Sequence, residues 1–529
     1  MTRETIVILG IPVDNLDMDE TVERIFALIE ASRRDGRARL VATVNVDFVV
    51  NTLTWRLSRL RHPELIDILR RADLVTPDGM PIIWTSRMLG APLKERVTGA
   101  DLVPRLAEAA ARNGKSIYFL GGQGDVGSRA ARLLQAQFPG LKVAGAESPF
   151  VKIEGEALTG ETAKDQEVVE RINRSGADIL LIGFGNPKQE VWFERNRSRL
   201  QVPVSIGIGG TYEFIVGSVA RAPQWMQAAG LEWIFRITQD PKRLWKRYIV
   251  GFFKFGLMIL PAIAYYRFKR RRTLKKNTGN TRRFDIRDHD LNLPDATFLR
   301  VIRLPEVLDA GAVENTRASL ENEIFAAGTP ILDFNNVKFI DSSGLGFIVG
   351  LWRRANRENK KLNLIEIRPS TRRFFQLSRT LDVFKDRVFA TMDEAVAHLA
   401  DETQQPPFYY LTVPRRRGVM LRLYGTLDAA QMQNLNTEAI LPVFGDRDCL
   451  LDLENLDFVD SSGIVFFLKI QKHIQKTARN CVLFGLQDNV RQMFRITKLD
   501  RLFRITADLG SAERYLEHAG PGKESVRSS

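Results

Sequence analysis

The chain has 529 residues, a formal net charge of +14 and only two cysteines, Cys449 and Cys481. This length exceeds what one hydrophobic core usually organises, so we expect about three globular domains. Two cysteines are too few for a disulfide framework or a cysteine-rich zinc site, and the first residues lack the apolar run of a signal peptide. These features exclude a secreted disulfide scaffold and predict a protein of the reducing cytosol.

The positive charge is concentrated in one segment. From Arg221 to Arg283 the chain carries sixteen Lys or Arg against two acids, Glu232 and Asp240, and this excess equals the whole net charge. A basic segment beside a hydrophobic run suits anionic lipid head groups better than a nucleic-acid duplex, which usually meets the basic face of a folded module. We therefore expect a membrane surface as a partner, and no nucleic acid.

Up to about residue 220, apolar β-rich runs alternate with amphipathic helical stretches. The expected strands lie in TIVILGIPV, RLVATVN, DLVTPDG, SIYFLGG, LKVAGAE, DILLIGFG and VPVSIGIGG. This alternation predicts an α/β domain over residues 1–220, with a Rossmann-like, mostly parallel sheet covered on both faces. Ligands bind at the carboxyl ends of such strands, where the loops of this chain are rich in Gly and polar residues.

Four separated motifs carry a family resemblance. In chain order they are TVNVDFVVN, VTPDGMPIIW, GFGNPKQEVWFERN and RAPQWMQAAGLEWIFRITQDPKRL. Together they resemble the WecG/TagA/CpsF glycosyltransferase family over roughly residues 5–250. The resemblance implies inverting transfer of an N-acetylmannosamine-type or related hexose from a UDP-sugar donor to a polyprenyl-diphosphate-linked acceptor, in surface or exopolysaccharide assembly and without a cofactor.

An acceptor hydroxyl must lose its proton as it attacks the anomeric carbon, and a carboxylate in a glycine-lined cleft is the natural base. Asp78 is the candidate; the alternative is that Asp78 and Gly79 form only a turn. The resemblance makes Thr43, Asn45, Gln189 and Glu190 substrate-contacting, although each could instead serve helix capping or the helix dipole. The glycines expected to line the substrate site are Gly79, Gly122, Gly209 and Gly210.

Metal-independent transfer is expected. The one Asp-x-Asp pair, Asp17-Met18-Asp19, directly precedes an amphipathic helix and is better explained as an N-cap. The diphosphate leaving group would then depend on basic side chains, which the resemblance places at Arg221, Arg236, Arg243, Lys246 and Arg247. Lys246 stands where the family pattern has Arg, and lipid binding is the alternative role for all five.

Residues 221–283 are expected to form a basic and aromatic membrane-associating appendage. Its apolar run, Ile249 to Tyr266, just reaches the length of a transmembrane helix but contains Lys254 and Pro261. We expect a monotopic or re-entrant insertion at the cytoplasmic face of the bacterial inner membrane, and a packed core helix is the alternative. The aromatic residues expected at the lipid interface are Trp225, Trp233, Trp245 and Tyr248.

The remaining chain contains an internal repeat. ILDFNNVKFIDSSGLGFIVG and LLDLENLDFVDSSGIVFFLK align at a constant offset of 119 residues, which predicts two copies of one α/β module over 284–403 and 408–520. Both copies resemble STAS domains, the fold of anti-sigma-factor antagonists. The resemblance points to phosphorylation at Ser342 and Ser461 by a serine kinase, with a phosphatase or an anti-sigma-like protein as a further partner; Ser342 is favoured because the second copy departs slightly from the motif.

Two function classes remain open. The first is the regulated glycosyltransferase just described, and an assembly of several copies is compatible with it. The second is a catalytically inactive, membrane-anchored signalling scaffold that acts through its two STAS-like modules. The intact Asp78, Gln189 and Glu190 favour the enzyme.

Overall fold

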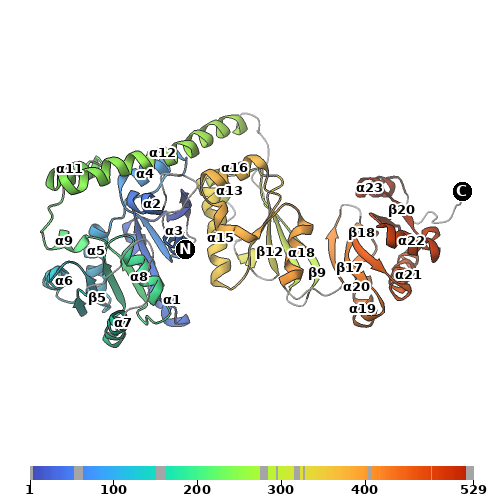
Figure 1. Cartoon of the computed structure of the whole chain (residues 1–529), viewed down its shortest axis with the longest axis horizontal. Helices are drawn as coiled ribbons and strands as arrows, with labels where there is room; N and C mark the ends of the chain where they lie inside the picture. The colour runs from blue at the N-terminus through green and yellow to red at the C-terminus, as the bar shows by residue number, and fades with distance from the viewer. Residues whose placement is uncertain are drawn as a thin grey trace.

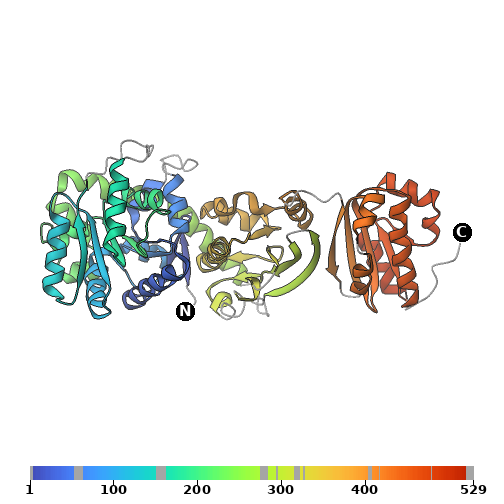
Figure 2. The ribbon, with the colours of Figure 1, turned by 90° about the horizontal axis from the view of Figure 1, so that it is seen from below.

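The computed structural model arranges the chain as three lobes in a row, in sequence order (Figures 1 and 2). It describes residues 4–52, 63–149, 163–274, 284–293, 296–314, 322–325, 328–402, 408–415, 418–435, 437–477 and 479–519. In every view the N-terminus lies at the junction between the first two lobes.

The first lobe contains a parallel sheet of six strands in the order β4-β3-β8-β7-β5-β6. The strands are β3 (Arg39–Val44), β4 (Leu74–Pro77), β5 (Ser116–Gly121), β6 (Lys142–Glu147), β7 (Ile179–Gly183) and β8 (Val204–Gly207). The central strands are buried on both faces, as expected for a parallel sheet between helices. The predicted α/β class and parallel sheet are confirmed.

Helices cover both faces of this sheet. They are α1 (Met18–Asp35), α2 (Val46–Thr52), α3 (Pro63–Arg71), α4 (Met80–Met88), α5 (Gly99–Arg112), α6 (Val126–Gln137), α7 (Ala163–Ser175), α8 (Lys188–Asn196) and α9 (Thr211–Ile215). Asp17 is the N-cap of α1 and forms a capping box with Glu20. This confirms the capping role expected for the Asp-x-Asp segment.

The first predicted strand differs from expectation. TIVILGIPV forms a separate antiparallel hairpin, β1 (Thr5–Ile8) and β2 (Ile11–Asp14), instead of joining the main sheet. Leu9 and Gly10 both have positive φ angles, of 48° and 81°, as the two central residues of a tight hairpin turn require. The apolar run therefore folds back on itself.

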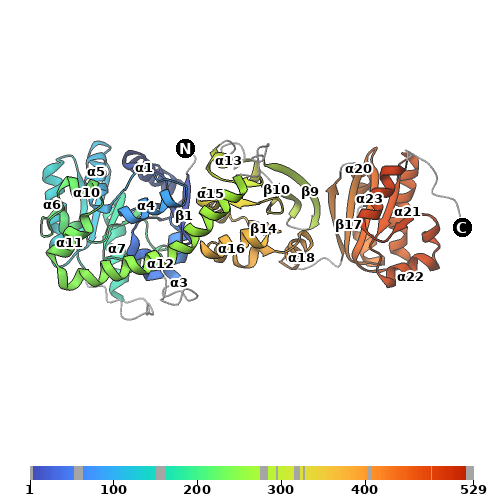
Figure 3. The ribbon, with the colours of Figure 1, turned by 90° about the horizontal axis from the view of Figure 1, so that it is seen from above.

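Three helices follow the sheet: α10 (Gln224–Ala228), α11 (Glu232–Gln239) and α12 (Pro241–Leu274). Figure 3 shows α12 crossing from the first lobe onto the second. By length and composition alone, Leu244–Lys269 could span a membrane, yet 39% of its most apolar window is buried against the protein. Lys254 points inward and donates to the carbonyl oxygen of Val50 at 3.0 Å.

The second and third lobes share one ten-stranded sheet, ordered β15-β14-β12-β10-β9-β16-β17-β18-β19-β20. The copies meet where β16 pairs with β9 at Leu411 and Leu291. The strands of the second lobe are β9 (Asp285–Leu293), β10 (Ala296–Arg303), β12 (Thr329–Asp333), β14 (Asn363–Ile365) and β15 (Val388–Phe389), with a small pair β11 (Val307–Leu308) and β13 (Phe339–Ile340). Those of the third are β16 (Phe408–Pro414), β17 (Gly418–Leu427), β18 (Asp448–Val459), β19 (Cys481–Phe484) and β20 (Arg504–Thr506).

The helices of the two copies correspond. The second lobe has α13 (Ala310–Glu314), α15 (Ser342–Arg357), α16 (Pro369–Leu377), α17 (Leu381–Phe384) and α18 (Met392–Glu402). The third has α19 (Ala429–Asn434), α20 (Thr437–Phe444), α21 (Ser461–Lys476), α22 (Asp488–Ile496) and α23 (Leu509–His518). Helices α15 and α21 begin at the same motif position, as do α16 and α22, and this confirms the predicted duplication.

Candidate active site

A cleft of about 990 Å³ opens at the carboxyl ends of the parallel strands. Parallel α/β sheets place ligands at this edge because the loops after the strands converge there. A smaller hollow of about 110 Å³ adjoins the cleft and shares Asn45, Asp78 and Arg236 with it. The chain thus brings residues from the first half of the sheet, the second half and α11 to one place.

Asp78 directly follows β4 and lines both the cleft and the hollow. Its backbone N–H donates to the carbonyl oxygen of Val44 at 2.8 Å, which ties the end of β4 to the end of β3. Burial raises the pKa of Asp78 to about 6, while the guanidinium groups of Arg236 and Arg96 limit the rise. A carboxylate with this pKa is ionised at neutral pH yet basic enough to accept a proton.

Two arginines and one glutamate surround Asp78. Glu232 accepts from Nη1 of Arg96 at 2.9 Å and lies 3.5 Å from Nη2 of Arg236. The Arg236 guanidinium also packs over the ring of Phe214, with its central carbon 4.5 Å from the ring centroid. These contacts hold Arg236 in the cleft wall, where a positive charge can meet a phosphate.

Thr43 and Asn45 lie where the sequence places them, at the end of β3 and in the cleft wall. Each also has a structural bond. The Thr43 hydroxyl donates to the carbonyl oxygen of Gly207 at 2.9 Å, and Oδ1 of Asn45 accepts from the Asp47 N–H at 3.0 Å at the start of α2. Asn45 therefore has the structural role given as the alternative, and its side chain also hydrogen-bonds Asp78.

Gln189 and Glu190 have different positions although they are neighbours. Gln189 lines the cleft and accepts the Gly209 N–H at 3.0 Å. Glu190 is fully buried beneath it and accepts from Nε2 of Gln189 at 2.7 Å. Glu190 was expected to contact substrate, but the preceding turn directs only the Gln189 side chain into the cleft. Glu190 instead holds the Gln189 side chain through this hydrogen bond.

The predicted glycines border the site. Gly122, Gly209 and Gly210 line the cleft, and Gly79 lines the hollow. Gly79 has a φ of 111°, which a residue with a side chain rarely adopts, and it lets the chain turn into α4 directly after Asp78.

The five basic side chains expected to meet the diphosphate differ in their positions relative to the cleft. Arg236 lines the cleft. Arg221 forms a two-pronged ion pair with Asp101, so its charge is already matched, and Lys246 is exposed on the outer face of α12. Neither lines the cleft, which differs from the expectation for both. Arg243 and Arg247 lie on α12, but their side chains are outside the described part of the structure.

Several residues that line the site were not predicted to lie there, and one of them, Tyr248, was expected at the lipid interface instead. Arg96 and Glu232 form the ion-pair network around Asp78, and Tyr248 of α12 closes the cleft wall beside Arg236. Asn51 donates to Oδ1 of Asn186 at 2.8 Å across the cleft. Asn51 and Asn186 stand inside the motifs quoted above, so those motifs held a usable signal; nothing in the local sequence distinguishes Arg96 from a surface arginine.

Among the residues that the structure describes, no three or more His, Cys, Asp or Glu side chains are grouped as metal ligands would be. Asp19, the second acid of the Asp-x-Asp segment, pairs instead with Arg105 at 2.7 Å. The acidic groups at the cleft are Asp47, Asp78, Glu213, Glu232 and Asp240.

The two DSSG segments have similar geometry and different exposure. Asp341 caps α15 by accepting the Gly344 N–H at 2.9 Å, and Asp460 caps α21 through Gly463 at 2.8 Å. Ser342 is buried, whereas Ser461 is exposed. The sequence favoured Ser342 as the phosphorylation site because its copy keeps the motif, whereas in the structure Ser461 is the one of the two serines that is open to solvent.

The carboxyl edge of this parallel sheet carries a carboxylate with a raised pKa and an arginine held in position by its neighbours. Such a pair is suited to a group transfer in which the leaving group is an anion. The chain belongs to the glycosyl transferase WecG/TagA/CpsF family, whose profile matches residues 6–272, and it carries two STAS domains, matched over 291–395 and 410–512. It is therefore a glycosyltransferase with a duplicated STAS tail.

Two curated relatives each align with about half of the chain. An N-acetylglucosaminyldiphosphoundecaprenol N-acetyl-beta-D-mannosaminyltransferase of Bacillus spizizenii is 26% identical over 238 residues, which cover 45% of this chain and 85% of the relative. The enzyme of the same name from Staphylococcus aureus is 27% identical over 269 residues, which cover 51% of this chain and 94% of the relative. Among solved structures, the anti-sigma factor antagonist SpoIIAA in its unphosphorylated form is 20% identical and covers 21% of this chain and 99% of its own, with a TM-score of 0.19.

Proposed function

We propose that the protein transfers an N-acetylmannosamine-type or related hexose from a UDP-sugar to a polyprenyl-diphosphate-linked acceptor in the assembly of a surface or exopolysaccharide. The names of the relatives describe such a transfer to an undecaprenyl-diphosphate-linked sugar. The observation that carries the proposal is Asp78, a carboxylate with a pKa of about 6 that lines a large cleft together with the neighbouring Arg236.

The proposed step is a single displacement without a metal ion. The acceptor hydroxyl attacks the anomeric carbon and gives its proton to Asp78, while the bond between that carbon and the UDP oxygen breaks. One displacement inverts the anomeric configuration. The charge that develops on the leaving diphosphate is met by Arg236, which is already oriented by Glu232 and Phe214.

We further propose that α12 lies on the cytoplasmic face of the membrane. Its inner face packs on the protein, and its outer face carries a row of exposed apolar side chains at helical spacing: Trp245, Ile249, Phe253, Leu257, Leu260 and Phe268. The first turns of α12 also line the cleft through Leu244 and Tyr248. A helix seated in the head-group region would therefore bring a lipid-borne acceptor to the mouth of the cleft.

The second STAS domain is the proposed site for a regulatory partner. Ser461 is exposed at the N-terminus of α21, where a phosphate adds about −1.5 to −2 charges and changes a docking surface without refolding the domain. A serine kinase with its phosphatase, or an anti-sigma-like protein, fits this surface.

The test is transfer from a panel of UDP-sugars to a polyprenyl-diphosphate-N-acetylglucosamine analogue in detergent, with a chelator present. The proposal expects product from at least one N-acetylmannosamine-type donor, with inverted anomeric configuration by NMR. Transfer that requires added divalent metal, or retention of configuration, would contradict the mechanism. Absence of transfer from a folded, membrane-bound protein would favour the inactive scaffold.

A further inference from the structure

Helix α15 of the first STAS domain packs directly on the first hairpin of the catalytic domain. A Cβ atom added to Gly346 would lie 1.5 Å from the carbonyl oxygen of Thr5, so only glycine permits this approach. On the other side of the contact, the residues of β1 and its turn, Ile6 to Leu9, are all buried. The surface next to the DSSG motif is therefore already occupied by a segment of the same chain.

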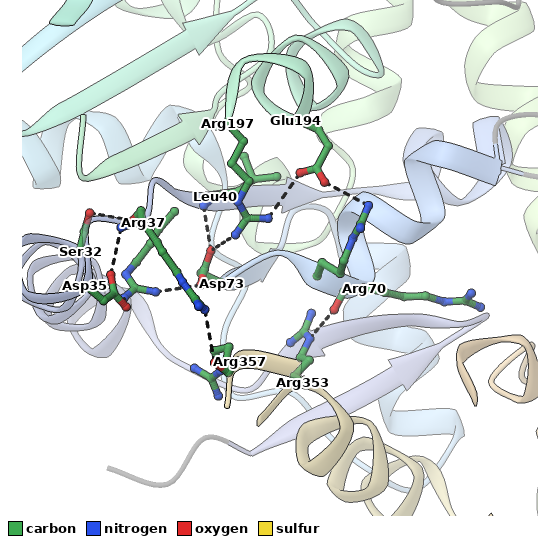
Figure 4. A network of polar contacts seen from close by, with 12 residues as sticks. Ser32, Asp35, Arg37, Leu40, Arg70, Asp73, Glu194, Arg197, Arg353 and Arg357 are labelled. Atoms are coloured by element: carbon green, nitrogen blue, oxygen red, sulfur yellow. Dashed lines mark hydrogen bonds and ion pairs between the residues drawn. The ribbon is translucent and has the colours of Figure 1, made fainter. Parts of the chain in front are cut away.

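Two buried arginines donate hydrogen bonds across this contact in opposite directions, and Figure 4 shows the bond from Arg353 to the backbone of Arg70. Arg353 of α15 donates to the carbonyl oxygens of Arg70 and Leu69, at 2.7 and 3.1 Å, and thereby caps the C-terminal end of α3. In the opposite direction, Arg70 donates to the carbonyl oxygen of Arg379 in the STAS domain at 2.7 Å. Both guanidinium groups are buried. Separating the domains would remove the two carbonyl partners of Arg353 and the Arg379 carbonyl from Arg70, which would keep its bond to Gly10 within the first domain.

The contact reaches the strand that carries Asp78. Helix α3 leads through two residues into β4, and Asp78 follows β4. Asp14, at the end of the hairpin, accepts the N–H of Val75 in β4 at 2.7 Å and lies 3.7 Å from Nη1 of Arg353. Arg353 therefore supports β4 twice, through the helix that precedes it and through the hairpin beside it.

The second STAS domain has different residues at the matching positions. Val465 stands where the first copy has Gly346, and Lys472 stands where it has Arg353. Val465 and Leu468 of α21 are exposed, with exposed fractions of 43% and 42%. A valine at this position cannot approach a backbone carbonyl as Gly346 does, and lysine lacks the fork that caps two carbonyls.

We propose that the α15 face of the first STAS domain is the docking surface for the β1–β2 hairpin of its own chain, that glycine at position 346 restricts this docking to the first copy, and that the docked domain braces β4. The first STAS domain is then a fixed part of the enzyme, and only the second copy keeps the equivalent face free. The bracing of β4 as the Asp78 strand rests on the proposed function, whereas the docking does not.

The test exchanges the two copies' residues in the full-length protein. Gly346→Val introduces the residue of the second copy, and Val465→Gly is the matched control. Hydrogen–deuterium exchange measured by mass spectrometry should accelerate at least about tenfold in peptides that cover residues 5–14 and 70–78 of Gly346→Val, and should stay at the wild-type rate in Val465→Gly. Wild-type exchange in both variants would overturn the docking surface.

A second pair of variants distinguishes loss of docking from misfolding of the first STAS domain. Misfolding of that domain would show as faster exchange in residues 329–365. Arg353→Ala keeps Gly346 but removes the hydrogen bonds to the carbonyl groups at the end of α3. Lys472→Ala, at the matching position of the second copy, is its control. Exchange in residues 63–78 should accelerate in Arg353→Ala and not in Lys472→Ala. Transfer by Arg353→Ala should fall about 10- to 100-fold, as displacement of a reacting group by a remote change does. Faster exchange combined with a wild-type rate of transfer would contradict the proposal that the docked domain supports β4, but not the proposed docking surface. The exchange results can be interpreted whether or not a donor sugar is found.

Discussion

The side-chain nitrogen of Gln189 donates to Oε1 of Glu190 at 2.7 Å, directly beneath the floor of the cleft. Glu190 is fully buried, and burial raises the pKa of its carboxyl group to about 8. The carboxyl group is therefore protonated at neutral pH. Its role is to hold the Gln189 amide, which also accepts the Gly209 N–H, in one orientation toward the cleft.

The stability of the first domain should depend on pH through Glu190. Its unfolded pKa is about 4.3 and its folded pKa is higher, so the folded state binds more protons between the two values. Stability from this group is present at low pH and is lost as pH rises toward 8. Glu190→Gln removes this loss of stability. The difference in melting temperature between pH 6 and pH 8.5 should therefore be smaller in Glu190→Gln than in wild type. Glu167→Gln, an exposed site on α7, is the control; an unchanged pH difference in Glu190→Gln would contradict the assignment.

Transfer should also titrate with Asp78. The carboxylate must be ionised to accept a proton, and its pKa is raised to about 6. The value of kcat/KM should therefore fall about tenfold per pH unit below 6 and be nearly constant from 7 to 8. A rate that stays constant down to pH 5, in protein that remains folded by circular dichroism, would exclude Asp78 as the base.

Arg236→Ala should reduce kcat by roughly 10²- to 10³-fold, as loss of a group that stabilises developing charge does, with a smaller change in KM. Arg236→Lys should recover part of the rate, because the charge returns without the planar fork. Arg105→Ala, which removes an exposed arginine paired with Asp19, is the control for loss of one positive charge. An equal loss in both alanine variants would contradict a specific role for Arg236.

The orientation of α12 can be tested with two phenylalanines two residues apart. Phe253 is 63% exposed and Phe255 is 5% exposed. Phe253→Ser should weaken binding to vesicles of anionic lipid about tenfold or more while leaving the melting temperature unchanged, because only its contact with lipid is lost. Phe255→Ser should instead destabilise the fold by about 3 kcal/mol. Equal vesicle binding by Phe253→Ser and wild type would exclude the outer face as the membrane contact.

Sequence patterns predicted the main architecture because buried parallel strands and an internal repeat leave strong signals. The hairpin at residues 5–14 was missed, since an apolar run of nine residues does not reveal where it reverses; the turn depends on Leu9 and Gly10 together. The contact between α15 and this hairpin was also beyond prediction, because Thr5 and Gly346 lie far apart in the chain. The limits drawn for the segments 1–220, 221–283, 284–403 and 408–520 remain predictions.

The site was predictable where motif and strand end coincide. Thr43 lies at the end of β3, the other three residues, Asn45, Asp78 and Gln189, follow strands or a turn at the carboxyl edge, and the structure brings all four to one cleft. Charge alone did not separate Arg236 from Arg221. Both side chains form ion pairs with acids, and the fold decides that Arg236, and not Arg221, lines the cleft. Glu190 and Arg96 show the same limit, since partners supplied by the fold decide whether each faces a ligand. The roles of all these residues in catalysis and binding remain predictions.

The most direct test of the central claim is sugar transfer by Asp78→Asn compared with Asp19→Asn, with chelator present. Asp19 belongs to the Asp-x-Asp segment, is exposed and lies outside the cleft, so its variant controls for the loss of one carboxylate and for a metal-binding role of that segment. The proposed function expects wild-type transfer from Asp19→Asn and a loss of at least about 10²-fold from Asp78→Asn, in the range of a lost general base. Full transfer by Asp78→Asn, or loss of transfer by Asp19→Asn, would contradict it.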